Sequence, residues 1–280
     1  YLLILYLILL FQLHFKHTGG NDSTISEWLI NYQGGFTKRG IIGEICFNIA
    51  NLLKMELRFV IYLFQISIIG IYYFLIFQLF KKLKTNFLIL LSIFSPIFLL
   101  YPIAELEVLG RKEIFVFIGY ILFLNLTNTR FKKKEDLLFI IFALPILSLI
   151  WEPVIFFIPF FIGALIFKYN VLNLKQLFKI LIYFVPFIFI SIFIALNPIS
   201  DENHRLMAES LMNNFDERCY MSCALLLPKS TILHQFTANL HLYSFEIIFK
   251  YSLIILIGFG PLFAISKFSK IRTKCFFFKN

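Results

Sequence analysis

Polar side chains that could do chemistry are concentrated in one stretch of the N-terminal half, residues 21–44. The candidates there are Asp22, Glu27, Lys38, Arg39 and Glu44. A carboxylate can take a proton from a hydroxyl group, and the planar guanidinium of arginine binds oxyanions through two parallel hydrogen bonds. The stretch therefore predicts a site where a carboxylate acts as general base and basic side chains bind phosphate.

The local pattern around Glu27 predicts a short helix. Thr24-Ile25-Ser26-Glu27 fits the capping box, with Thr24 as N-cap and Glu27 reaching back to its backbone, and Gly34-Gly35 would end the helix after Gln33. Trp28 and Tyr32 would form a face that prefers the membrane interface. A simpler alternative is that Glu27 only caps, that the aromatics are belt residues, and that the basic pair contacts lipid headgroups.

Two further positions carry charge between apolar segments. The run 104–113 ends in Arg111-Lys112-Glu113, and Trp151-Glu152-Pro153 places one carboxylate in apolar surroundings. A carboxylate in such surroundings should be protonated or paired, and we expect the basic pairs to be its partners. The alternative for 104–113 is a loop whose acids and bases neutralise one another.

The late polar segment, residues 197–245, offers Arg205 as an anion contact, together with several histidines whose spacing matches no metal motif. A solvated loop is the simpler interpretation of most of these residues. Cys219 and Cys223 share this segment and could form a disulfide in an oxidising compartment. The CxxxC spacing leaves that pairing open.

Composition explains what must position these residues. Apolar residues make up 60% of the 280 positions and charged residues 15%, with a mean hydropathy of +0.84. Soluble domains are less apolar and more highly charged. The sequence therefore predicts an all-α, polytopic transmembrane helix bundle, with the short interfacial helix in its first outer loop. We expect one integral membrane domain over residues 1–280. The start at Tyr1 inside an apolar run leaves open whether the chain is a fragment of a longer protein.

About eight apolar segments are long enough to be considered as spans. They cover residues 1–15, 57–80, 86–104, 113–129, 137–151, 153–167, 177–196 and 246–266. With eight spans, 15 of the 26 basic residues lie on one side, which the positive-inside rule makes cytoplasmic. The N-terminus is then cytoplasmic, and residues 16–56 and 197–245 form the large outer loops. The net charge of +10 thus indicates anionic lipid as the partner and not nucleic acid.

The region 137–167 is the uncertain part of this topology. A single long span would reverse the orientation of all that follows, whereas a hairpin turning at Glu152-Pro153 keeps the carboxylate out of the bilayer centre. We favour the hairpin, and a re-entrant pair is the alternative. The chain has no Walker A loop, GxGxxG, GxSxG or HExxH motif, so nucleotide hydrolysis, dinucleotide redox chemistry and metalloprotease activity have no support.

The run from Asn31 to Glu44, the triplet Arg111-Lys112-Glu113 and the pair Trp151-Glu152 resemble segments of uncharacterised bacterial polytopic membrane proteins linked to surface polysaccharide synthesis. Trp151 departs from the His expected there, which puts a proton-transfer role at that position in doubt. The layout is also similar to GT-C-type glycosyltransferases and to O-antigen polymerases.

These resemblances imply glycosyl transfer from a polyprenyl-phosphate-linked sugar at the outer face of a bacterial inner membrane. Asp22, Glu27 and Glu152 would be catalytic. Substrate binding would fall to Lys38, Arg39, Glu44, Arg111, Lys112, Glu113 and Arg205. No cofactor is implied, with a divalent metal left open, and other polysaccharide-assembly proteins are conceivable partners. The rivals are a lipid-linked glycan flippase and a non-catalytic assembly subunit.

Overall fold

The computed structural model describes residues 1–20, 23–81, 87–94, 99, 108–128, 133–169, 171, 173–226, 240 and 244–268. Within these ranges every regular element is a helix, which confirms the all-α prediction. Four helical segments are long and apolar enough to cross a membrane: Leu2–Gly19, Leu57–Phe80, Glu152–Tyr169 and Leu174–Leu196. These segments support the prediction of a membrane protein.

The chain divides into two compact units. Unit 1 comprises Tyr1–Lys81 and Gly110–Leu227, and unit 2 comprises Lys82–Leu109 and Pro228–Asn280. In unit 2, α5 (Phe87–Ile93) packs against α14 (Phe245–Phe268). These two helices fall in the segments predicted at 86–104 and 246–266. Much of the first of those segments lies outside the described residues. All contacts discussed below are within unit 1.

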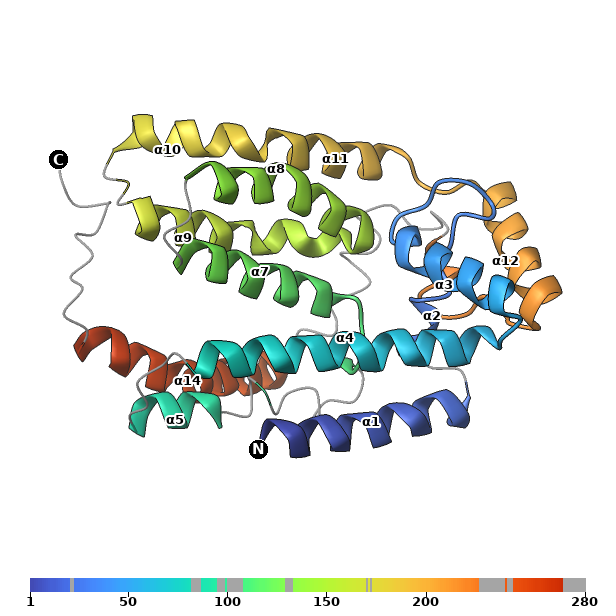
Figure 1. Cartoon of the computed structure of the whole chain (residues 1–280), viewed down its shortest axis with the longest axis horizontal. Coiled ribbons are helices and arrows are strands. Elements are labelled where there is room, and N and C mark those ends of the chain that lie inside the picture. Colours follow the sequence, from blue (N-terminus) through green and yellow to red (C-terminus); the bar gives the residue numbers. More distant parts are fainter. Residues whose placement is uncertain are drawn as a thin grey trace. The chain divides into compact units, whose positions relative to one another are not determined.

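The long helices of unit 1 pack side by side (Figure 1). They are α1 (Leu2–Gly19), α4 (Leu57–Phe80), α7 (Glu113–Asn128), α8 (Lys133–Ile150), α9 (Ile158–Tyr169), α10 (Leu174–Leu181) and α11 (Val185–Leu196). Apart from the amphipathic α10, these helices are largely apolar on all sides, so large side chains are found both in the core and on the surface. Ile61 and Phe123 are buried, for example, whereas Phe74 and Phe189 are exposed. Exposed apolar side chains on this scale are expected where helices face lipid.

The region 137–167 forms the predicted hairpin. Helix α8 ends at Ile150, Trp151 is extended, and the 3-10 helix η2 (Glu152–Phe157) leads into α9. Pro153 suits this start because the first turn of a helix does not need its missing N–H group. At the other end of the pair, Lys168 and Tyr169 bind the carboxylate of buried Asp136. Contact between the start of α8 and the end of α9 means that the two helices are antiparallel.

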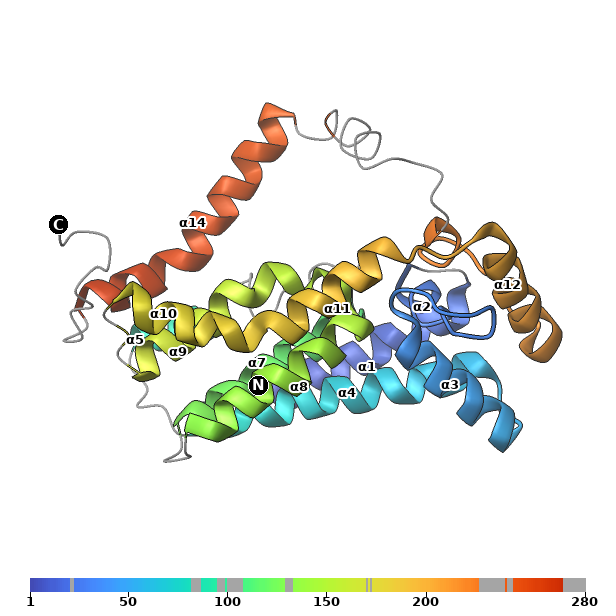
Figure 2. The same cartoon turned by 90° about the horizontal axis from the view of Figure 1, so that it is seen from above.

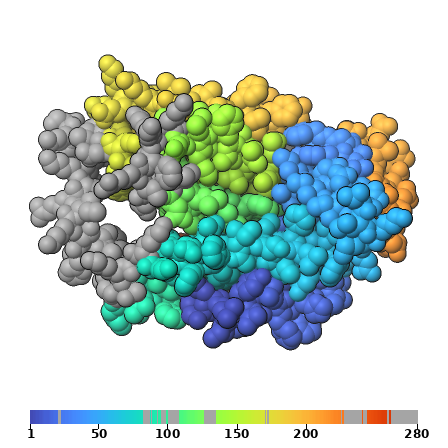
Figure 3. All heavy atoms as spheres, in the orientation of Figure 1, coloured from blue at the N-terminus to red at the C-terminus, as the bar shows by residue number. Residues whose placement is uncertain are grey.

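Three other helices gather at one end of unit 1: α2 (Ser23–Ser26), α3 (Gly40–Leu53) and α12 (Asp201–Phe215). They lie at the same end in both ribbon views (Figure 1 and Figure 2), and α3 and α12 are neighbours on the surface in Figure 3. We call this region the polar end. Helix α12 begins where the Ser200 hydroxyl accepts the Asn203 N–H and two acids fill the first turn, which are favourable features of a helix N-terminus.

The predicted helix from Ile25 to Gln33 is wrong. Helix α2 stops at Ser26, and the residues that follow are turns and irregular backbone as far as α3. The capping box fails because the Glu27 carboxylate binds groups from other segments instead of its own helix start. Trp28 is also no interface residue, since it is fully buried. Tertiary contacts have overridden the local pattern.

Candidate functional site

A cluster of four bases and three acids lies at the polar end, where three segments that are distant in sequence meet. We call it the charge cluster; its members are Glu27, Lys38, Arg39, Arg111, Lys112, Glu113 and Glu152. They come from the loop before α3, the start of α7 and the tip of the α8–α9 hairpin. All seven belong to the predicted set of site residues.

Arg39 connects two of these segments. Its Nε and Nη2 donate to the two oxygens of Glu152 at 2.6 and 2.8 Å, and its Nη1 donates to Glu27 Oε1 at 2.8 Å. The paired bonds to Glu152 form the fork arrangement that also suits a phosphate group. Burial lowers the pKa of Arg39, but the hydrogen bonds and charges of Glu152 and Glu27 raise it by more. Arg39 therefore stays charged.

The backbone at Arg39 is strained. Its φ of 62° is in the left-handed region, which costs L-residues roughly 1–2 kcal/mol. Arg39 is the N-cap of α3, and its carbonyl accepts the Nζ of Lys112 at 2.6 Å. Three partners thus hold this one residue, by its side chain and by its carbonyl. Strain held in this manner is found most often at functional sites.

Glu27 is the buried anion of the cluster, with 1% of its surface exposed. Besides Arg39, it accepts the backbone N–H of Lys112 at 3.4 Å and lies 3.8 Å from Arg111 Nε. Such a set of partners compensates the cost of burying a carboxylate. With so many donors around it, Glu27 is well placed to hold the basic groups in position.

Lys112 is fully buried, with no exposed surface. Burial lowers the pKa of its ammonium group to about 8, against the opposing effect of Glu27. Its Nζ lies 6.0 Å from the centre of the Trp28 ring, which adds a cation–π contact. Lys112 was expected to contact substrate, but its position beneath Arg39 indicates a structural task.

Arg111 and Lys38 are the cations of the cluster that face outward, with 34% and 43% of their side chains exposed. Arg111 Nε lies 3.1 Å from Glu113 Oε1, and Lys38 Nζ lies 3.6 Å from Glu152 Oε1. The second oxygen of Glu113 is buried and has no hydrogen-bond partner among the described residues. The exposed side of the cluster therefore offers two cations, each beside an acid.

A second set of hydrogen bonds fixes the start of the 110–113 turn. The carbonyl of Gly110 accepts Trp28 Nε1 at 2.9 Å and Gln65 Nε2 at 3.0 Å. Because the Gln65 amide nitrogen faces this carbonyl, its oxygen faces His17, and His17 Nε2 is then the donor in their 2.7 Å contact. Gly110 has a φ of 69°, which glycine adopts without strain.

The first polar loop can approach its neighbours closely because it contains glycines. A Cβ at Gly43 would lie 1.9 Å from the Ile30 carbonyl oxygen, and a Cβ at Gly34 would lie 1.8 Å from the Asn203 carbonyl oxygen. The first close approach packs α3 against the backbone of residues 28–30. The second packs the loop at Gly34 against α12. The absence of a side chain at Gly43 thus allows α3 to approach the backbone of residues 28–30 closely.

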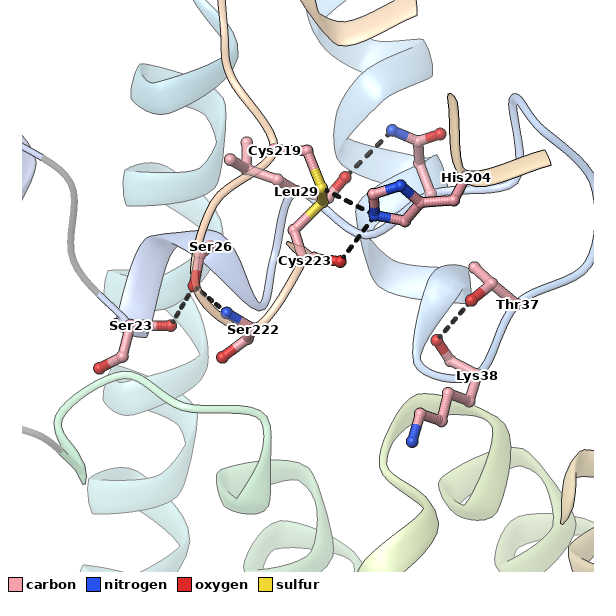
Figure 4. Close-up of a disulfide and its surroundings, with 10 residues drawn as sticks. Ser23, Ser26, Leu29, Thr37, Lys38, His204, Cys219, Ser222 and Cys223 are labelled. Carbon is pink, nitrogen blue, oxygen red and sulfur yellow. Dashed lines mark hydrogen bonds between the residues drawn. A yellow bond between two sulfur atoms is a disulfide. The ribbon is translucent and has the colours of Figure 1, made fainter. Parts of the chain in front are cut away.

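The segment after α12 lies against α2. Cys219 and Cys223 form a disulfide, and His204 Nε2 donates to the Cys223 carbonyl at 3.1 Å and lies 3.4 Å from Cys219 Sγ (Figure 4). The Ser222 N–H binds the Ser26 hydroxyl at 3.2 Å, next to Glu27 in the chain. The imidazole and both sulfurs lie within 4.8 Å of one another, but disulfide sulfurs are not thiolate ligands for a metal.

Three predicted site residues are not part of the charge cluster. The Glu44 carboxylate accepts the Tyr32 N–H and the side chains of Gln33 and Asn48, which closes the glycine loop. Arg205 is exposed on α12 and pairs with Glu209 one turn along. Asp22 lies outside the described residues.

The contacts of Gln65 with His17 and Gly110 are not predicted from the charged residues of the sequence. Gln65 is an amide inside the apolar run 57–80 and is 1% exposed. A polar side chain in a membrane helix usually binds a neighbouring segment, so the amide itself was the available signal. Trp28 was noticed but was assigned to the interface.

Comparison of the chain with protein-family models, with curated proteins and with solved structures finds no match. The geometry of the charge cluster therefore carries the functional argument.

Proposed function

We propose that this chain is a membrane glycosyltransferase or polysaccharide polymerase that uses a polyprenyl-phosphate-linked sugar at the outer face of the membrane. The observation that supports it most is the meeting of three separate segments at the Arg39 guanidinium, with two outward-facing cations beside it. In transfer from a lipid phosphate, cations stabilise the charge that develops on the leaving phosphate, and a carboxylate can accept the proton of the acceptor hydroxyl. The resemblance to GT-C enzymes and O-antigen polymerases points the same way but is a weaker warrant.

Arg111 and Lys38 are the proposed first contacts for the donor phosphate, because they are the most exposed cations of the cluster. The cluster has four bases and three acids, so one positive charge is left to attract an anion. A phosphate arriving there would compete with Glu152 for the fork of Arg39. Both ligands have the oxygen spacing that the guanidinium binds.

Displacement of Glu152 from Arg39 would produce the general base. The freed carboxylate takes the proton of the acceptor hydroxyl, and the hydroxyl oxygen attacks the anomeric carbon of the donor sugar. The bond between that carbon and the phosphate oxygen breaks, and the lipid phosphate leaves with the electron pair. Arg39, Arg111 and Lys38 stabilise the charge that develops on it. Glu27 positions the guanidinium throughout.

The proposal includes the topology of about eight spans with a cytoplasmic N-terminus in a bacterial inner membrane. A periplasmic-reporter fusion at residue 220 tests it, because Tyr220 follows α12 at the polar end. Reporter activity would place the charge cluster outside. An inactive fusion with stable expression would place it in the cytoplasm, where soluble sugar nucleotides are available, and would remove the reason for a lipid-linked donor.

Single substitutions test the enzyme assignment. Arg111→Ala and Glu152→Gln should abolish polymer formation in cells while the protein accumulates normally, whereas Arg205→Ala, on the exposed face of α12, should leave it intact. Polymer formation that survives both cluster substitutions would favour an assembly subunit. Polymer made but retained inside would favour a flippase. Assay with and without EDTA tests for a divalent metal.

A further inference from the structure

Helices α7 and α9 form an apolar groove with a volume of about 510 Å³. Tyr120 and Leu124 line it from α7. The α9 residues that line it are Pro159, Phe160, Gly163, Ala164, Phe167 and Lys168. Phe160 and Phe167 form exposed walls, and Gly163 lies between them in the sequence. We call this feature the α7–α9 groove. Its volume falls within the range of cavities that hold organic ligands.

The groove lies on the two helical segments that start at the charge cluster. Helix α7 starts at Glu113, and the η2–α9 segment starts at Glu152. Both residues are members of the cluster. At 1.5 Å per residue, Tyr120 lies about 10 Å along α7 from Glu113. A ligand with its head at the cluster could therefore extend its chain along the groove without leaving these two helices.

Among the described residues that line the groove, the one charged side chain is Lys168, at the far end. Its ammonium group binds buried Asp136, which also accepts the Tyr169 hydroxyl. An ammonium group paired in this way is a poor site for a second anion. The groove therefore suits an uncharged chain and leaves the anionic head to the charge cluster.

Space for such a chain is open at Gly163. A Cβ built on Gly163 would meet no atom within 4 Å. The small residues Gly163 and Ala164, together with Pro159, leave room on α9 between the bulky side chains of Phe160 and Phe167. Aromatic walls beside small residues form a contact surface for a methyl-branched, unsaturated chain.

We propose that the α7–α9 groove binds the isoprenoid chain of a polyprenyl phosphate whose phosphate lies at the charge cluster. The inference rests on the proposed function and names the lipid part of its substrate. An ordinary phospholipid acyl chain is the alternative occupant.

The test uses the whole purified protein in phosphatidylcholine nanodiscs, with a polyprenyl phosphate that carries a diazirine in its chain. After illumination, mass spectrometry should find adducts on residues 159–168 and on Tyr120 or Leu124. Unlabelled polyprenyl phosphate should remove these adducts, whereas an equal amount of phosphatidylglycerol should not. Equal competition by phosphatidylglycerol would overturn the inference without the need for any variant.

Gly163→Leu supplies the matched variant, because Gly163 lines the groove and a Cβ at this position would meet no atom within 4 Å. It should reduce labelling at least tenfold, while Ala195→Leu on the exposed face of α11 should leave labelling unchanged. Labelling that persists in Gly163→Leu would overturn the inference.

The two proposals can fail separately. Specific labelling of the groove, combined with normal polymer formation by Arg111→Ala, would support the groove and refute the enzyme. Loss of polymer in Arg111→Ala without specific labelling would refute the groove alone.

Discussion

Arg39 and Glu152, which are 113 residues apart in the sequence, form a bidentate ion pair with N–O distances of 2.6 and 2.8 Å. The pair joins the first polar loop to the tip of the α8–α9 hairpin. Glu152 occupies the side of the guanidinium that a phosphate would use. The ion pair is therefore both a structural tie and, under the proposed function, the contact that the substrate replaces.

Arg39→Lys should lower the free energy of unfolding by about 2–3 kcal/mol, because lysine cannot reproduce the fork and leaves Glu27 and Glu152 underpaired. Titration of the purified protein with SDS, followed by tryptophan fluorescence, measures this change. Arg205→Lys is the control and should be within about 0.5 kcal/mol of the wild type. Equal stability of Arg39→Lys and wild type would show that the fork contributes nothing.

Buried Lys112 predicts a dependence of stability on pH. Its pKa is about 8 in the folded protein, and the ordinary value is 10.5. Between these values the unfolded state binds more protons, so the free energy of unfolding should rise as pH increases from about 8 to 10.5 and should be flat below. Lys112→Met should remove this rise.

Lys175→Met is the control for this experiment, because Lys175 is exposed on α10. It should keep the wild-type slope between pH 8 and 10.5. A slope that is unchanged in Lys112→Met would assign the effect to another group.

Composition and charge predicted much of this fold, because their signals do not depend on distant contacts. An apolar run must be helical in a membrane to satisfy its own backbone. Likewise, Glu152 at the centre of an apolar run had to find a basic partner. Both predictions follow from the free-energy cost of burying a polar group without a partner.

The local structure around Glu27 could not be predicted in the same manner. Thr24-Ile25-Ser26-Glu27 has a capping pattern, yet the Glu27 carboxylate binds Arg39 and the Lys112 N–H, 12 and 85 residues away. A helix cap is worth about 1 kcal/mol, which is less than the cost of leaving those buried groups unpaired. Long-range ion pairs therefore decided the conformation, and sequence spacing does not reveal their partners.

The Cys219–Cys223 disulfide predicts a specific alkylation pattern. Unfolded but unreduced protein should be alkylated at Cys46, which is a free buried cysteine, and at neither Cys219 nor Cys223. After reduction Cys219 and Cys223 should react as well, and the free energy of unfolding should fall by about 2 kcal/mol. Alkylation of Cys219 before reduction would show that the bridge is absent from the protein as isolated.

Gln65→Leu should loosen the 110–113 turn. The Gly110 carbonyl would lose the Gln65 donor and keep Trp28 Nε1, and His17 Nε2 would lose its contact with the Gln65 amide oxygen. The free energy of unfolding should fall by about 1–3 kcal/mol. Lys112 should also become reactive toward an amine-acylating reagent, detected by mass spectrometry, although it is shielded in the wild type.

Ser67→Ala is the matched control for Gln65→Leu, since Ser67 is exposed on the same helix and its hydroxyl donates to the Leu63 carbonyl of that helix. It should change neither stability nor acylation. If Lys112 stays unreactive in Gln65→Leu, the Gln65 amide does not hold the turn.

Gly43→Ala should be far more damaging than the same change at Gly163, although both glycines are in helices. Alanine is the better helix former by about 1 kcal/mol, so Gly163→Ala, with no atom within 4 Å of the new Cβ, should be neutral or stabilising. At Gly43 the Cβ would lie 1.9 Å from the Ile30 carbonyl oxygen and 2.6 Å from that of Trp28. Backbone atoms cannot rotate aside, so α3 must move, at a cost of about 1–3 kcal/mol or more.

Because Arg39 caps α3, that movement should also draw its guanidinium away from Glu27 and Glu152, and polymer formation should fall further than the loss of folded protein explains. Equal stability of the two variants would show that α3 does not pack against the 28–30 backbone.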